Sequence, residues 1–304
     1  MVVLVTGGSG FIGSHVTDTL VAKGLTVRVL DKTRPLRPDV DWFQGDLLSN
    51  DDVYEALQDV ETVFHLAAVA DVNVASTDPQ LCLSVNELGT LKLLQACSGR
   101  EVERFILASS VWVYGKASEA VTEDTPLPIP GDLYTKTKIG QEHLVCSWGQ
   151  THSLPYTILR YDIPYGPRMR GNMAIAAFVR RAMNKEPITI FGDGKQGRCW
   201  VFVTDLAEAH YLAINQAASK QIINIAGTEF VTISSIVEML TKKLGAFPIK
   251  HEPPRPGDFA GVRTNIEKAK SVLGWAPQTS FEQGLSIYIK GLKAKVLSDE
   301  TPSG

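Results

Sequence analysis

Apolar runs of strand length alternate with amphipathic stretches through the first half of the chain. Strands are predicted at 2–5, 26–30, 62–68 and 104–110, with a shorter one at 42–47. After the first strand, Ile12, Val16 and Leu20 follow at helical spacing, and further helices are predicted near 51–58, 79–97 and 134–150. Strands that alternate with helices in this way predict an α/β fold, a parallel sheet doubly wound by helices.

The second half has the pattern of a smaller lobe. Strands are predicted at 156–160, 188–191, 201–203 and 222–225, and helices near 174–183, from 205 onward, 234–244, 269–275 and 281–289. We therefore assign residues 1–165 to the sheet domain and residues 166–304 mainly to an α+β lobe, with some later segments returning to the sheet. Thr232 or Ser234 is expected to cap the helix at 234–244, and residues 297–304 read as a loose tail.

The turn after the first strand carries three glycines, and a helix follows at once. Gly7 lets the chain reverse, Gly10 lets backbone approach a pyrophosphate, and Gly13 lets the helix pack close to the strand. The free N–H groups and the positive dipole end of the helix favour phosphate. A tight turn with spare glycines is the alternative, but the next strand ends in Asp31, about 20 residues on, where a carboxylate can bind ribose hydroxyls. The spacing predicts dinucleotide binding.

Asp31 also bears on which dinucleotide is bound. A carboxylate repels a 2′-phosphate, so NAD is favoured over NADP. Lys32 and Arg34 follow directly, and positive charges there soften this preference. The alternative is that both are solvated loop charges without effect on it. Asp46 is placed to meet an adenine, although a helix-capping role is an open alternative. The strand at 62–68 ends in small residues, which let a cofactor lie across it, and His65 within it is interpreted as a packed core histidine.

A tyrosine and a lysine separated by four residues carry the sharpest chemical hypothesis. Tyr134 and Lys138 project from one helical face, so an ammonium can lie beside a phenol and favour its phenolate. Ser110, at the end of a strand, can hydrogen-bond the same substrate oxygen. An exposed pair on a helix is the alternative, but with the glycine turn upstream the arrangement predicts acid–base catalysis.

Composition changes this picture little. With 304 residues, 44% of them hydrophobic and 21% charged, the chain is ordinary for a globular protein with a substantial core. A formal charge of −3 and a pI near 6.1 give no reason to expect nucleic acid as a partner. The four cysteines are far apart, so neither a metal site nor a disulfide framework is predicted. Apolar runs of strand length, and Met1 directly before a strand, predict no membrane span or signal peptide, hence a cytoplasmic protein.

Several motifs occur in a recognisable order over nearly the whole chain. They are GGSGFIG at 7–13, Asp31, GDL at 45–47, HLAA at 65–68, Asn86 with Gly89 and Thr90, Ser109 and Ser110 before VYG at 113–115, and Tyr134 with Lys138. With these motifs the chain resembles the extended short-chain dehydrogenase/reductase family, in its NAD-dependent sugar-nucleotide epimerase and dehydratase branch. The resemblance implies a Rossmann-type fold, bound NAD, a nucleotide-sugar substrate, and a homodimer formed by the helices near 79–97 and 134–150.

The resemblance also implies roles for individual residues. Tyr134, Lys138 and Ser110 are the implied catalytic residues, with Ser109 as an adjacent alternative to Ser110. The implied cofactor site consists of Gly7, Gly10, Phe11, Ile12, Gly13, Asp31, Lys32, Asp46, Leu47, Leu66, Ala67, Ala68, Asn86, Ser109, Tyr134 and Lys138. The implied substrate site consists of Ser110, Tyr134, Asn172, Arg198, Arg255 and Asp258, although the two arginines are alternatively plain surface residues.

Two segments depart from the pattern of the family. Ile163, within Asp162–Ile163–Pro164, stands where an asparagine near the substrate is usual, and Cys199–Trp200 stands where an acid and an aromatic residue are usual. Val111 and Trp112 occupy the places of the acidic pair that serves elimination in 4,6-dehydratases, which argues against that reaction. These departures affect the sugar and not the cofactor.

The sequence therefore predicts an NAD-dependent epimerase that inverts C4 of a nucleotide sugar, a UDP-hexose by resemblance, through a transient 4-keto sugar. A nucleotide-sugar dehydratase or a keto-sugar reductase is the alternative within the same class. A non-catalytic NAD-binding regulator is the alternative from a different class.

Overall fold

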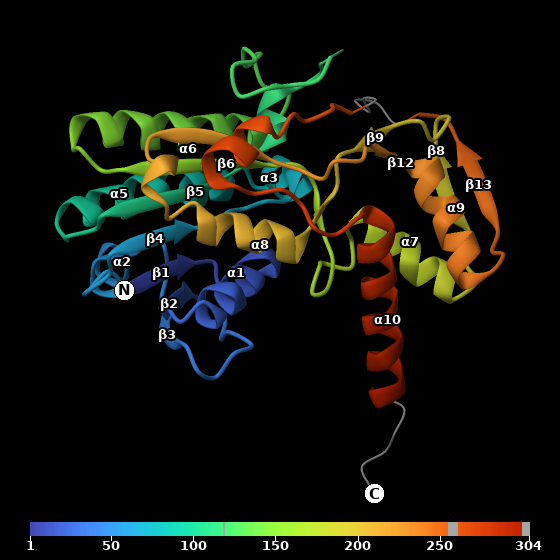
Figure 1. Cartoon of the computed structure of the whole chain (residues 1–304), viewed down its shortest axis with the longest axis horizontal. Coiled ribbons are helices and arrows are strands. Elements are labelled where there is room, and N and C mark those ends of the chain that lie inside the picture. Colours follow the sequence, from blue (N-terminus) through green and yellow to red (C-terminus); the bar gives the residue numbers. More distant parts are fainter. Residues whose placement is uncertain (118, 255–260, 300–304) are drawn as a thin grey trace, which may run out of the picture.

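A seven-stranded parallel sheet forms the centre of the described part of the chain, in the order β11–β6–β5–β4–β1–β2–β3. The computed structural model (Figure 1) describes all residues except 118, 255–260 and 300–304. The strands are β1 (Val2–Thr6), β2 (Thr26–Asp31), β3 (Asp41–Gln44), β4 (Thr62–His65), β5 (Arg104–Ser110), β6 (Tyr156–Tyr161) and β11 (Gln221–Ile225). The predicted Rossmann-type fold is confirmed.

Helices cover both faces of the sheet because successive strand residues point to opposite sides. On one face, Val3 and Val5 of β1 pack in a core with α1 (Phe11–Ala22) and α8 (Val203–Leu212). On the other face, Leu4 packs in a second core with α2 (Asn50–Ala56), α5 (Gly89–Ser98) and α6 (Leu133–Thr151). Figure 1 shows the sheet between these two layers. The continuous apolar strands predicted from the sequence are thus buried on both sides.

The predicted helix at 79–97 is interrupted in the structure. After α3 (Val72–Thr77), the chain forms α4 (Pro79–Leu83), a π-helical turn at Ser84–Leu88, and α5. Asn86 lies in this turn, where its amide accepts from Val69 N–H at 2.7 Å and donates to Val69 C=O and to Thr137 Oγ1. These bonds to residues outside the helix accompany the extra residue in the turn, and π-turns of this kind are frequent at functional sites.

The second lobe has its own apolar core, formed mainly by α7 (Ala174–Met183), α9 (Ile233–Leu244) and α10 (Phe281–Asp299). Three two-stranded sheets complete it: β7 (Pro164–Tyr165) with β10 (Val201–Phe202), β9 (Gly197–Arg198) with β12 (Val231–Thr232), and β8 (Ile188–Phe191) with β13 (Ile249–Glu252). Thr232 caps α9, because its hydroxyl accepts from Ser235 N–H. Residues 297–299, predicted to be a loose tail, belong to α10.

Short helical turns join these elements at Val111–Tyr114, Gln216–Ala218 and Ala269–Leu273. Segments after residue 166 return to the sheet domain, since β11 extends the sheet and α8 packs on α1. In the part of the chain that the structure describes, no helix combines the length and the apolar character needed to cross a bilayer. Among the same residues, no cluster of side chains suited to a metal ion occurs.

A buried ion pair joins α6 to the sheet. Arg160 of β6 donates from Nη2 to Glu142 Oε2 at 2.6 Å and from Nε to Oε1 at 2.9 Å, and both side chains are at most 4% exposed. Arg160 also donates to the hydroxyl of Tyr114, which in turn donates to Asn224 of β11. The guanidinium nitrogens of Arg160 and both carboxylate oxygens of Glu142 thus have hydrogen-bond partners. Buried charges are stable only with such partners.

We expect Arg160→Met to lower the free energy of unfolding by about 3–5 kcal/mol, because it leaves the Glu142 carboxylate buried without its partner. The matched control is Lys23→Met, which removes an ion pair with Glu208 whose two side chains are both 37% exposed. Urea unfolding followed by circular dichroism measures both variants. A loss for Arg160→Met no larger than that for the control would contradict a stabilising role of the buried pair.

Candidate active site

The turn between β1 and α1 is shaped by glycines at two positions where a side chain would not fit. Gly7 has φ +72°, and a Cβ there would lie 2.8 Å from the backbone of Ala67. A Cβ on Gly13 would collide with the carbonyl oxygen of Gly7. Gly10 begins α1 without a side-chain cap, so N–H groups of the first turn remain available to a ligand. This is the local geometry that a pyrophosphate requires.

A cavity of about 400 Å³ opens beside this turn. We call it the glycine cavity; its lining includes Gly7, Gly10, Asp31, Lys32, Asp46, Leu47, Leu66, Ala67 and Ala68. The Asp31 carboxylate is oriented by two backbone bonds, accepting from Ser9 N–H at 3.0 Å and from Thr33 N–H at 2.9 Å. A fixed carboxylate at the end of β2 suits the two hydroxyls of a ribose.

Lys32 and Asp46 form an ion pair at the rim of the glycine cavity, with Lys32 Nζ 2.8 Å from Asp46 Oδ2. Burial opposes ionisation of Asp46, but hydrogen bonds from Lys32 and from Leu48 N–H hold the pKa of its carboxyl below the usual value. Of the two roles left open for Asp46, helix capping is excluded, because Ser49 caps α2. Lys32 is therefore engaged with Asp46 in this structure.

A second cavity, of about 210 Å³, adjoins the first and shares Leu66 and Ala68 with it. We call it the tyrosine cavity, because Tyr134, Lys138, Ser109 and Ser110 line it together with Phe11 and Ile12. The two cavities follow the carboxyl ends of the parallel strands, where open α/β sheets bind their ligands. Together they offer an elongated site that fits a dinucleotide, with the glycine turn between its two ends.

The catalytic candidates are brought together by the start of α6 and the end of β5. Asp132 caps α6 by accepting from the backbone and hydroxyl of Thr135, and this places Tyr134 and Lys138 one turn apart facing the strand. Lys138 donates to the carbonyl oxygen of Ala108 at 3.0 Å, and its Nζ lies 6.0 Å from the centre of the Tyr134 ring.

The structure distinguishes the two serines at the end of β5. The Ser110 hydroxyl is hydrogen-bonded to the Tyr134 side chain, and it also accepts from Trp112 N–H at 3.2 Å. The Ser109 hydroxyl instead donates to Glu142 at 2.5 Å. Ser110 is thus the serine that contacts the phenol, whereas the hydroxyl of Ser109 is engaged with Glu142.

The ionisation of Tyr134 differs from the sequence-based expectation. Burial raises the pKa of the phenol to about 12, and the hydrogen bond from Ser110 offsets this only in part. Lys138 was expected to lower this pKa, but its ammonium is bound to Ala108, and among neighbouring charges it is Arg170 that acts to lower it. Burial also lowers the pKa of Lys138, to about 8. Without a bound ligand, the phenol at neutral pH is protonated.

Some residues predicted for the site lie elsewhere. Asn86 is fully buried and is not among the residues that line the two cavities; its amide is hydrogen-bonded to Val69 in the loop after β4. Gly13 packs beneath the turn. Asn172 donates to Asp71 at 3.2 Å and lines a cavity that shares Ala174, Gln196 and Ile233 with the cavity around Arg198. Arg255 and Asp258 lie outside the described residues.

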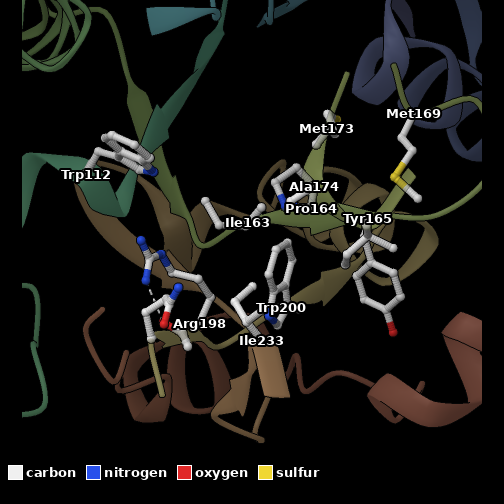
Figure 2. Close-up of a pocket in the computed structure, with 13 residues that line it drawn as sticks. Trp112, Ile163, Pro164, Tyr165, Met169, Met173, Ala174, Arg198, Trp200 and Ile233 are labelled. Atoms are coloured by element: carbon white, nitrogen blue, oxygen red, sulfur yellow. Dashed lines mark hydrogen bonds between the residues drawn. The ribbon is translucent and has the colours of Figure 1, made fainter. Parts of the chain in front are cut away.

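A third cavity, of about 260 Å³, contains Arg198 (Figure 2). In this arginine cavity the Arg198 guanidinium points toward Trp112 and donates to the carbonyl oxygen of Gly197 at 2.7 Å. Trp112, Ile163, Pro164 and Met173 line both this cavity and the tyrosine cavity, so the two adjoin.

Sequence reasoning did not assign several of the residues that line the tyrosine cavity, among them Arg170 and Met173. The loop after Pro167 carries no periodic pattern that would have identified them. Trp112 was noted only because it occupies one place of the acidic pair of 4,6-dehydratases.

A Rossmann sheet with a dinucleotide-sized site, completed by a Tyr–Lys pair and a serine, defines a short-chain dehydrogenase/reductase type of enzyme. A model of the NAD dependent epimerase/dehydratase family matches residues 3–226, which is more than half of the chain. The chain belongs to this family, and its residues at the glycine turn and at Asp31 fit the cofactor for which the family is named.

Solved structures and curated sequences agree with this assignment. A UDP-glucose 4-epimerase of Thermotoga maritima, solved with UDP-glucose, is 31% identical, with a TM-score of 0.92 over 97% of this chain and 100% of the other. A UDP-glucuronic acid 4-epimerase of Bacillus cereus, solved with UDP-glucuronic acid and NAD, is 32% identical, with a TM-score of 0.90 over the same shares. A UDP-glucuronate 4-epimerase of Thermodesulfobacterium geofontis is 30% identical over 96% of each chain.

We expect Asp31→Asn to weaken NAD binding by about 10- to 100-fold, the value of a hydrogen bond to a charged group. The same change should raise the affinity for NADP relative to NAD, because the repulsion of a 2′-phosphate is removed. Titration calorimetry with each dinucleotide measures both effects. The matched control is Asp41→Asn at the amino end of β3, where the carboxylate is 54% exposed and pairs with Arg28. An unchanged NADP to NAD ratio would contradict this role of Asp31.

Proposed function

We propose that this protein inverts C4 of a UDP-hexose, using bound NAD that is regenerated within each turnover. The observation that carries the proposal is the tyrosine cavity, which brings Tyr134, Ser110 and Lys138 together where the dinucleotide site adjoins the cavity of Arg198. A sugar that spans the tyrosine and arginine cavities has its reacting carbon at the phenol and its diphosphate near a guanidinium, which suits paired phosphate oxygens.

The glycine turn would hold the pyrophosphate of NAD, Asp31 its adenosine ribose, and Lys138 its nicotinamide ribose. When bound, NAD supplies the oxidant, removing the hydrogen of C4 with its electron pair and later returning it. Tyr134 accepts the proton of the 4-hydroxyl and gives it back to the carbonyl oxygen. Ser110 holds that oxygen through the hydroxyl that is already hydrogen-bonded to Tyr134.

Inversion requires the 4-keto sugar to present its other face to the same groups before the hydrogen returns. Arg198 anchors the diphosphate while the hexose rotates about the bonds that join the two. The proton and the hydrogen both return to the atoms they left, so the reaction is a net isomerisation. Asn172, Arg255 and Asp258 are proposed to contact the nucleotide, by their match to the motifs of the family.

The tyrosine cavity favours epimerisation over dehydration. Elimination of water across C5 and C6 needs a carboxyl group near those carbons, whereas the places of the acidic pair hold Val111, which is buried, and Trp112. Asp162 is the one carboxylate among the described residues that line the tyrosine cavity. Its oxygens accept hydrogen bonds from Ile163 N–H, Cys199 N–H and the Thr264 hydroxyl. These bonds give the Asp162 carboxylate a structural role.

We further propose a cytoplasmic homodimer. The four cysteines are all free thiols, which suits a reducing compartment. Val74, Leu81, Leu83 and Leu88, between α3 and α5, are each at least 37% exposed, and α6 lies beside them. Apolar side chains gathered in this way support the pairing of these helices between two copies, with the mass from light scattering as its measure.

The protein is expected to convert UDP-hexoses to their C4 epimers with no added reductant or oxidant. Tyr134→Phe should lower kcat by about 10²–10⁴-fold, the usual contribution of a positioned acid–base group, while NAD binding persists. Proton NMR of the sugar nucleotides measures the conversion. The phenol of Tyr54, which is 46% exposed, provides the control variant Tyr54→Phe. Full turnover by Tyr134→Phe, or consumption of added NADH, would contradict the proposal.

The pH dependence should report the ionisation of Tyr134. The phenolate is the active base, so kcat/KM is expected to rise with pH through the pKa of this group. The hydrogen bond from Ser110 lowers that pKa, and Ser110→Ala should therefore move the rising limb to higher pH. Ser109→Ala, whose hydroxyl is engaged with Glu142, should leave the limb in place. A limb that does not move in Ser110→Ala would show that this serine does not act on the phenol.

A further inference from the structure

One wall of the proposed substrate site is apolar. It consists of Trp112, Ile163, Pro164 and Met173, which line the tyrosine and arginine cavities alike, and we call it the shared wall. Figure 2 shows Ile163 and Pro164 between Trp112 and Met173. All four side chains are partly exposed, as expected for residues that border an open cavity.

The shared wall lies where a bound hexose must lie. This step rests on the proposed function, in which Tyr134 and Ser110 bind the oxygen on C4 and Arg198 binds the diphosphate on C1. C1 and C4 are opposite one another across a hexopyranose ring, so the ring extends along the shared wall. C3 and C5 are both bonded to C4, so the substituents of both carbons lie close to Ser110. Because the ring must turn over between the two half-reactions, each of its edges faces the wall once per cycle.

The position of Trp112 is fixed relative to the catalytic serine. Ser110 Oγ accepts from Trp112 N–H at 3.2 Å and caps the short helical turn that carries the indole. The same oxygen is hydrogen-bonded to Tyr134. The residue that carries the indole is thus in the turn capped by Ser110, two residues from the group that holds the C4 oxygen.

The chemistry of the wall selects among possible C5 substituents. Its four side chains carry one polar group, the indole N–H of Trp112. A hydroxymethyl oxygen placed against this wall loses its hydrogen bonds to water and gains only contacts with hydrocarbon, which costs free energy. A carboxylate loses its hydration at a greater cost. A methyl group gains dispersion contacts there, whereas a lone hydrogen leaves the wall without a partner.

The other polar groups of the tyrosine cavity have partners of their own. Ser109 is bonded to Glu142, Lys138 to Ala108, and Asp162 to two backbone N–H groups and one hydroxyl. Arg170 differs, because it is exposed and carries a full charge toward the same cavity. A charge at the solvent boundary is screened, so it favours a uronate only weakly. UDP-glucuronate is nonetheless the competitor that a test must include.

From these contacts we infer that the hexose is a 6-deoxyhexose, with a methyl group as its C5 substituent. The substrate of this chain is then a UDP-6-deoxyhexose, and the shared wall is what distinguishes it from UDP-glucose and from UDP-glucuronate.

The test compares four nucleotides that differ only at C5: UDP-6-deoxyglucose, UDP-glucose, UDP-glucuronate and UDP-xylose. Initial rates of C4 inversion are followed by NMR on the unmodified protein. We expect kcat/KM for UDP-6-deoxyglucose to exceed that for UDP-glucose by about 10- to 100-fold, the range a single group gives in an apolar pocket. Values for UDP-glucuronate and UDP-xylose should be lower than that for UDP-6-deoxyglucose. An equal or higher value for any of the three would overturn the inference.

A variant of the wall tests the cause. Ile163→Asn adds an amide to the shared wall and should move the ratio of the two kcat/KM values toward UDP-glucose by about tenfold. Ile129→Asn makes the same change at a side chain that is 95% exposed and should leave the ratio unaltered. Trp112→Ser provides a second change in the wall with the same expected direction. An unchanged ratio in both wall variants would show that the wall does not select the substituent.

The panel separates this inference from the proposed function. If UDP-glucose or UDP-glucuronate is inverted in preference to UDP-6-deoxyglucose, C4 epimerisation stands and the inference about C5 is wrong. If none of the four nucleotides is inverted at C4, the proposed function itself is wrong, and the inference is wrong with it.

Discussion

The buried ion pair between Glu142 and Arg160 is the interaction on which the geometry of the active site depends. It joins α6, which carries Tyr134 and Lys138, to β6, beside the strand that ends in Ser110. Glu142 also receives the hydroxyl of Ser109, so one carboxylate fixes both the helix and the strand. Paired charges in a buried place hold their partners to a narrow geometry, because every displaced hydrogen bond leaves an unsolvated group behind. A catalytic contact between residues of two elements needs that precision.

The main features of the fold were predictable because its signals are local. Strand-length apolar runs, helical spacing and the glycine turn each act within a few residues, and the doubly wound parallel sheet follows from their alternation. The pairing of Tyr134 with Lys138 is equally local, since four residues on a helix share a face. The π-turn at Asn86 was missed because the bonds that accompany it join Asn86 to Val69 and Thr137, which are 17 and 51 residues away.

The electrostatics of the site could be predicted only in part. Proximity of Lys138 to Tyr134 suggests a lowered pKa, but proximity in sequence does not reveal that the ammonium donates to Ala108 or that the phenol is enclosed. Arg170 reaches the cavity from a loop without periodic pattern, so its influence on the phenol had no sequence signal. The burial of the phenol and the direction of the Lys138 side chain depend on the tertiary structure. They determine that the pKa of Tyr134 is raised and not lowered.

The raised pKa of the catalytic phenol makes its ionisation depend on the charge of the cofactor. In the protein without ligand, burial keeps Tyr134 protonated, with a pKa of about 12. A positive charge brought into the same low-dielectric cavity favours the phenolate strongly, since charges interact more there than in water. The oxidised nicotinamide ring carries such a charge and the reduced ring does not. The phenolate is therefore more populated when an alcohol is to be oxidised, and the phenol regains its proton affinity when the ring has been reduced.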